Sequence, residues 1–103
     1  MTTQETYQAR LKRVNDAIRL EQVPDRVPIV PAASALPFFL TEDTTYRDAM
    51  YDFPKAARAI YAFCRDFQPD AFNGPALTSG RSNELAGSTM IDWPGRPGTR
   101  VPD

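Results

Sequence analysis

Few side chains in this chain of 103 residues could act as catalysts or metal ligands. The sequence contains no histidine and one cysteine, Cys64. Pairs of a serine or cysteine nucleophile with histidine, HExxH zinc motifs and cysteine zinc sites are therefore excluded within it. Cys64 has no histidine or lysine at helical spacing that would activate its thiol, so we expect a small buried hydrophobe. The sequence predicts no catalytic residue and no metal ligand in this chain.

The segment 74–82, GPALTSGRS, is the local pattern closest to a nucleotide-binding motif. A phosphate-binding loop needs four residues between its glycines and then a lysine, whereas this segment has five and then Arg81. We predict an ordinary loop, with an anion at the helix N-terminus near Ser82 as the alternative. The paired acidic residues, which we attribute to capping and solvation, are Glu42 and Asp43, Asp48 and Asp52, and Asp66 and Asp70.

The composition limits the class of protein. Twelve basic and thirteen acidic residues give a formal charge of −1, which offers no electrostatic reason to expect nucleic acid or a membrane as partner. The N-terminus lacks the basic and apolar regions of a signal peptide, and the longest apolar stretch is too short to cross a bilayer. One unpaired cysteine fits a reducing compartment. We expect a soluble cytoplasmic protein of at most one small domain.

Two strong helical patterns must position any site. The first begins at a capping box of Thr2 and Glu5, and it stops near residues 21–22, before Pro24. The second has Asp52 as N-cap and ends before Pro69. The apolar face of the first helix consists of Tyr7, Leu11, Val14 and Ile18. That of the second consists of Ala56, Ala57, Ile60, Phe63, Cys64 and Phe67.

Two short strands are predicted on either side of the second helix. Segment 24–31, PDRVPIVP, suits a strand buried on both faces, and segment 70–73, DAFN, suits a second. Shorter helices are expected after Thr45 and around residues 81–86, and residues 33–40 form either a short helix or an apolar loop. The strand–helix–strand order favours an α/β fold with parallel strands.

The opening helix, QARLKRVNDAIRLEQ, followed by PDRVPIVP resembles the N-terminus of the uroporphyrinogen decarboxylase superfamily. Segments 69–72, PDAF, and 83–87, NELAG, look like that family's second strand entry and its "eaeAlG" segment. The superfamily fold is a TIM (β/α)₈ barrel. The resemblance therefore implies an N-terminal helix and the first two βα units of a barrel that is incomplete in this chain. Residues 1–91 would belong to the barrel domain, and 92–103 would be a Pro/Gly-rich loop at which the sequence is truncated.

The resemblance also implies a function for a complete protein. True decarboxylases carry RQAGR after the first strand, where this chain has AASAL at 32–36, and their catalytic aspartate has no counterpart at 73–77. The branch implied is therefore the one that transfers a methyl group from a corrinoid protein to a thiol. Its partners would be a small-molecule substrate or a corrinoid protein, with zinc held only by residues beyond this chain. A homodimer is also expected, and this chain alone is expected to be inactive.

Barrel geometry places site residues at the carboxyl ends of the strands. Asn73 and Glu84 are accordingly the candidate substrate-binding residues, with hydrogen bonding in a loop or at a helix start as the alternative. Two other functions stay open. One is uroporphyrinogen decarboxylation in tetrapyrrole biosynthesis. The other is a non-enzymatic small α/β interaction module whose exposed sheet edge docks another chain.

Overall fold

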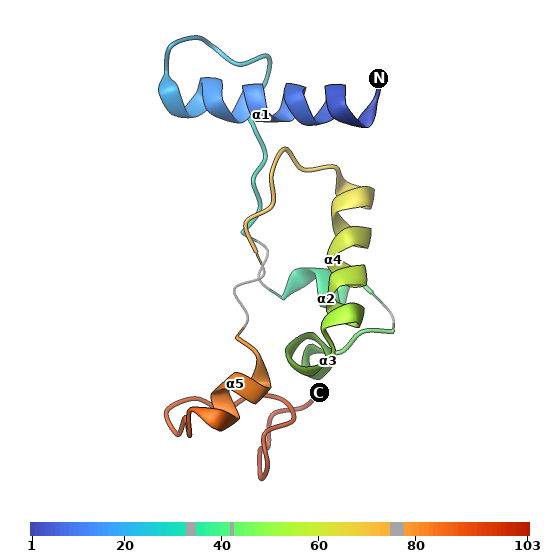
Figure 1. Ribbon diagram of the computed structural model, residues 1–103, viewed down its shortest axis with the longest axis vertical. Helices are drawn as coiled ribbons and strands as arrows, with labels where there is room; N and C mark the ends of the chain where they lie inside the picture. The colour runs from blue at the N-terminus through green and yellow to red at the C-terminus, as the bar shows by residue number, and fades with distance from the viewer. Residues whose placement is uncertain (33–34, 42, 75–77) are drawn as a thin grey trace.

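The computed structural model describes residues 1–32, 35–41, 43–74 and 78–103, and these form five helices and no strand (Figure 1). Helix α1 (Thr3–Arg19) lies at one end of the molecule and α5 (Gly80–Leu85) near the other. Between them, α2 (Leu36–Phe39), α3 (Tyr46–Tyr51) and α4 (Phe53–Phe67) pack together. None of the helices in the described ranges is long and apolar enough to cross a membrane.

The two long helices begin as the sequence predicts. The Thr2 hydroxyl accepts a hydrogen bond from the Glu5 N–H at 3.1 Å, and the Glu5 carboxylate accepts one from the Thr2 N–H at 2.7 Å, so the capping box of α1 is confirmed. Helix α1 ends at Arg19, slightly before the predicted stop, because Leu20 turns into the left-handed region at φ 59°. Helix α4 begins at Asp52, whose carboxylate accepts from the Lys55 N–H at 3.1 Å.

The predicted short helices are also present. Thr45 and Asp48 form the capping box of α3, and α5 is followed by Gly87 at φ 65°. Helix α2 decides between the two alternatives for residues 35–40, while 33–34 lie outside the described residues. The predicted loop at 74–82 also includes residues 75–77, which are likewise outside the described ranges.

The hydrophobic core lies between α2, α3 and α4. Its centre is Phe38, whose side chain is 1% exposed, and small side chains surround it: Ala49, Ala56 and Ala59. The apolar face expected for α4 is partly wrong, because Ala57 and Phe67 are exposed while Ala59 is buried. No residue of the α1 stripe is fully buried: Val14 is half-buried and the others are exposed. Helix α1 packs against no other helix in the described part of the chain.

The predicted strands at 24–31 and 70–73 are wrong for the described residues, although the two segments run side by side (Figure 1). Ile29 O accepts from the Asp70 N–H at 2.9 Å, and Pro31 O accepts from the Asn73 N–H at 3.2 Å. No regular ladder follows, because prolines at 24, 28 and 31 have no N–H to donate. The Ile29 N–H donates instead to the Asp70 carboxylate at 2.8 Å. At Ile29 a side-chain carboxylate therefore accepts the hydrogen bond that a neighbouring strand's carbonyl would accept in a sheet.

This finding corrects the fold class. The described residues are helical and hold no sheet, so they are not the first two βα units of a TIM barrel. The expected burial of the first segment on both faces is also wrong, since Val27 is 80% exposed and Ile29 60% exposed. The sheet edge invoked for an interaction module is likewise not found within the described ranges. The overall shape is elongated, with a radius of gyration of 17.2 Å against about 13 Å expected for a globular domain of this length.

Trp93, Tyr51 and Glu84, which we call the Trp93 anchor, hold the C-terminal segment against α3 and α5. The Trp93 indole N–H, on a side chain that is 3% exposed, donates to the Tyr51 hydroxyl at 2.8 Å. The Tyr51 ring lies so close to Gly80 and Gly95 that a Cβ at either position would come within 3.0 Å of it. Larger residues would displace this ring, and at Gly95 the positive φ of 87° adds backbone strain.

Phe38 provides a test of where the core lies. Phe38→Ala should lower the free energy of unfolding by about 3–5 kcal/mol, because it leaves a cavity between α2 and α4. Phe39→Ala is the matched control, since its neighbouring side chain is 71% exposed, and it should cost less than about 1 kcal/mol. Urea denaturation followed by circular dichroism measures both. Equal losses would contradict this placement of the core.

Candidate functional site

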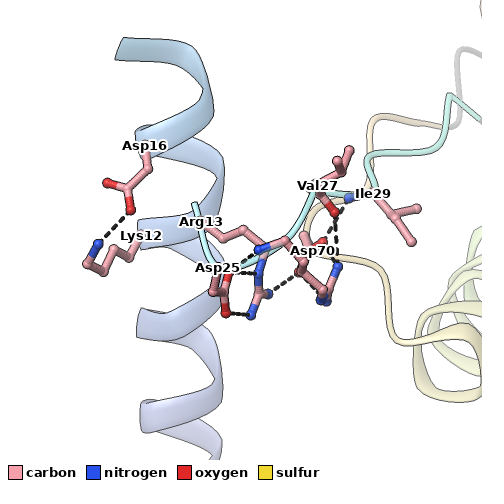
Figure 2. A network of polar contacts seen from close by, with 8 residues as sticks. Lys12, Arg13, Asp16, Asp25, Val27, Ile29 and Asp70 are labelled. Carbon is pink, nitrogen blue, oxygen red and sulfur yellow. Dashed lines mark hydrogen bonds and ion pairs between the residues drawn. The ribbon is translucent and has the colours of Figure 1, made fainter. Parts of the chain in front are cut away.

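Asp70 organises the polar centre of the molecule (Figure 2). Its side chain is fully buried, and the Arg26 guanidinium binds it in a two-pronged contact at 2.8 and 2.9 Å. Arg13 on α1 also donates to it, as does the backbone N–H of Ile29. A buried carboxylate needs such partners, and here it has three.

Arg13 links this carboxylate to a second one. Its guanidinium binds Asp25 at 2.6 and 2.7 Å while it contacts Asp70, so it bridges the two acidic residues. We call these four residues, Arg13, Asp25, Arg26 and Asp70, the clasp. Its two positive and two negative charges balance. The clasp joins α1 to the segments that precede α2 and follow α4.

The electrostatics of the clasp favour the charged forms. Burial alone would raise the pKa of the Asp70 carboxyl, but the Ile29 N–H and the Arg26 and Arg13 guanidiniums outweigh it, so the pKa is lowered. The hydrogen bonds from Arg13 lower the pKa of Asp25 to about 2. The same contact with Asp25 raises the pKa of Arg13. The shifts of Asp25, Asp70 and Arg13 all favour their charged forms at neutral pH, which suits a structural role better than proton transfer.

A groove of about 720 Å³ lies beside the clasp, between α1 and α4. One wall carries Tyr7, Leu11 and Val14 of the α1 stripe, and the other carries Tyr61 and Cys64 of α4. Residues 69–72, which follow α4, also line it. Tyr7 and Tyr61 are 56% and 70% exposed, so both walls present apolar surface to solvent. Three of the four residues in the predicted α1 stripe thus line a groove rather than a core, and Ile18 lies outside the lining.

Cys64 is half-buried in the groove wall, so the prediction of a buried hydrophobe is only partly met. No group of three or more histidine, cysteine or acidic side chains in the described ranges is arranged to hold a metal ion. A groove lined this way offers apolar contact and a few charged groups at its edge.

The structure keeps the two candidate substrate-binding residues outside this groove. Asn73 is exposed, and its backbone N–H donates to Pro31 O. Glu84 lies on α5, where its carboxylate accepts from the Tyr51 hydroxyl at 2.8 Å and pairs with Arg81 at 3.0 Å. The hydrogen bond from Tyr51, and to a smaller extent the one from Arg81, lowers the pKa of Glu84. Glu84 thus belongs to the Trp93 anchor, and the substrate-binding role of both residues stays a prediction.

Sequence reasoning missed the residues that matter most in the structure. Nothing in the sequence indicates a joint role for Arg13, Arg26 and Asp70, because Arg26 is 44 positions and Arg13 is 57 positions from Asp70. The prediction that Asp70 serves capping and solvation is wrong, because its side chain is fully buried. The one available signal was the placement of a charged residue at the start of an apolar segment.

Comparison with known proteins identifies no relative. The chain matches no protein-family model, and neither curated proteins nor solved structures show detectable similarity to it.

Asp70→Asn should lower the free energy of unfolding by about 2 kcal/mol at pH 7, because it removes the charge that the two guanidiniums bind. In the parent, the folded-state pKa values of Asp25 and Asp70 lie below the unfolded value of about 3.9. Their contribution is therefore complete above pH 4 and is lost as the pH falls towards 2. The variant should show a smaller loss over that range.

Asp66→Asn is the matched control, because Asp66 pairs with Arg65 at an exposed position. It should leave the denaturation midpoint unchanged. Urea midpoints measured from pH 2 to 7 decide the question. If Asp70→Asn and Asp66→Asn behave alike, the clasp does not hold α1 in place.

Proposed function

We propose that this chain is a non-enzymatic interaction module that binds an amphipathic helix of a partner polypeptide in the groove between α1 and α4. The observation that carries the proposal is the exposure of apolar side chains on two helices that do not pack against each other. Exposed apolar surface of this kind marks interaction sites in soluble proteins. Such a module would use this groove rather than a sheet edge.

The dimensions of the groove favour a helix as the occupant. The α1 wall runs from Thr3 to Val14, which is about 16 Å at the helical rise per residue. That length matches about three turns of a partner helix. An apolar stripe of such a helix would contact Leu11 on one wall and Tyr61 on the other, in the helix-in-groove manner of peptide recognition.

The groove suits a small molecule less well than a helix, because its charged groups are distributed over two helices. Sites for small ligands combine apolar walls with several precisely placed polar groups. Among the described residues that line this groove, the one carboxylate is that of Asp70, whose oxygens are taken up by Arg13, Arg26 and the Ile29 N–H. The two guanidiniums of the lining, Arg10 and Arg65, come from different helices. A polypeptide satisfies its own backbone when it binds as a helix, so it needs no such groups from the groove.

Leu11→Asp should abolish binding of a synthetic amphipathic helix that has a leucine stripe and glutamine on its polar face. A carboxylate there would lose its water on binding, at a cost of at least tenfold in Kd. Ile18→Asp makes the same change on the same helix outside the groove lining, and it should leave Kd within about twofold. Fluorescence anisotropy of the labelled peptide measures both. No binding by the parent, or equal loss in the two variants, would contradict the proposal.

A second candidate function is methyl transfer from a corrinoid protein to a thiol by a longer protein that includes this chain. The observation in its favour is that the two segments on which the family resemblance rests contact each other, through Arg26 and Asp70 and through Ile29 and Asp70. Zinc does not fit the residues of this chain, which has no histidine and one cysteine, so no step of the reaction is assigned to them.

The complete translation product tests this second function. We expect it to contain zinc and to transfer a methyl group from a methylated corrinoid protein to a thiol. Turnover of uroporphyrinogen without zinc or methyl transfer would favour the decarboxylase branch instead. A product that carries out neither reaction would overturn both assignments.

A further inference from the structure

The two helices that form the groove carry most of the positive charge of the chain. Helices α1 and α4 hold seven of the twelve basic residues and only three of the thirteen acidic ones. The whole chain has a formal charge of −1, so this is a separation of charge within the molecule rather than a general excess. The groove therefore lies in the positive part of the chain.

The groove lining itself also carries positive charge. Arg10 on α1 and Arg65 on α4 line it from opposite walls. Arg10 donates to the neutral side chain of Gln68, which leaves its charge uncompensated by that contact. Arg65 pairs with Asp66, but both side chains are more than half exposed, so that pair is weak. The Asp70 carboxylate contributes no compensating charge, because the clasp neutralises it.

We propose that the partner helix carries acidic residues beside its apolar stripe, so that carboxylates meet Arg10 and Arg65 when the stripe enters the groove. This inference rests on the proposed function and adds the charge of the partner. Guanidinium groups bind carboxylates through paired hydrogen bonds, and two such contacts on opposite walls would also fix the register of the helix.

The same charges argue against a second copy of this chain as the occupant. Helix α1 has four basic and two acidic residues, and α4 has three basic and one acidic. Either helix, placed in the groove of another copy, would bring like charges towards Arg10 and Arg65. An acidic partner avoids this repulsion.

Three synthetic helices with the same leucine stripe and with glutamate, glutamine or lysine on the flanks test the inference. At low salt the glutamate peptide should bind at least about tenfold more tightly than the lysine peptide, and added salt should shrink the ratio. The double variant Arg10→Glu, Arg65→Glu should abolish or reverse this preference. The double variant Arg19→Glu, Arg58→Glu changes the same two helices by the same charge outside the groove lining, and it should keep most of the preference.

The outcomes separate the inference from the function on which it rests. Binding of all three peptides with equal affinity would overturn the acidic partner and leave the groove as a helix-binding site. Binding of none would overturn both. Equal effects of the two double variants would also contradict the inference, because the preference would then come from overall charge.

Sedimentation showing that the chain forms a dimer that Leu11→Asp dissociates would assign the groove to a second copy instead. Circular dichroism confirms that each variant stays folded.

Discussion

The buried carboxylate of Asp70 is the point at which three separate parts of the chain meet. Removing a carboxylate from water is costly, so its burial depends on cationic and N–H partners that approach closely. Arg13 brings α1, while Arg26 and the Ile29 N–H bring the segment that precedes α2. The direction of α1 relative to α4 thus follows from satisfying one charged group rather than from apolar packing. The groove lies beside this polar contact, between two helices that make no contact with each other.

The molecule consequently has two centres of different chemistry. Around Phe38, small side chains on α3 and α4 let short helices approach closely, and the contact is apolar. Around Asp70, the contacts are ionic and the apolar side chains point to solvent or into the groove. The apolar surface of the groove is exposed and can contact another polypeptide. The positive side chains beside it, Arg10 and Arg65, favour a polypeptide with acidic residues.

Local signals in the sequence predicted the helices well, because each depends on residues three or four positions apart. The capping boxes at Thr2 and Thr45 and the N-cap at Asp52 are all of this kind. The strand prediction for 24–31 is wrong because three of its residues are prolines, which have no N–H to donate to a ladder despite the apolar composition of the segment. The site was beyond reach for a different reason. Nothing local indicates that Asp70 meets Arg13, and the apolar stripe of α1 looks the same in sequence whether it faces a core or an open groove.

Because α1 contacts no other described helix, we expect α1 and the core around Phe38 to unfold locally with different free energies. The hydrogen-bonded amides of α1 can open when the clasp releases, without any change around Phe38, whereas those of α4 near Ala56 and Ala59 open only when the apolar core is disrupted. Amide hydrogen exchange would therefore proceed in two cooperative units. A partner that occupied the groove would couple them, because its helix would contact both α1 and α4 and slow exchange in each.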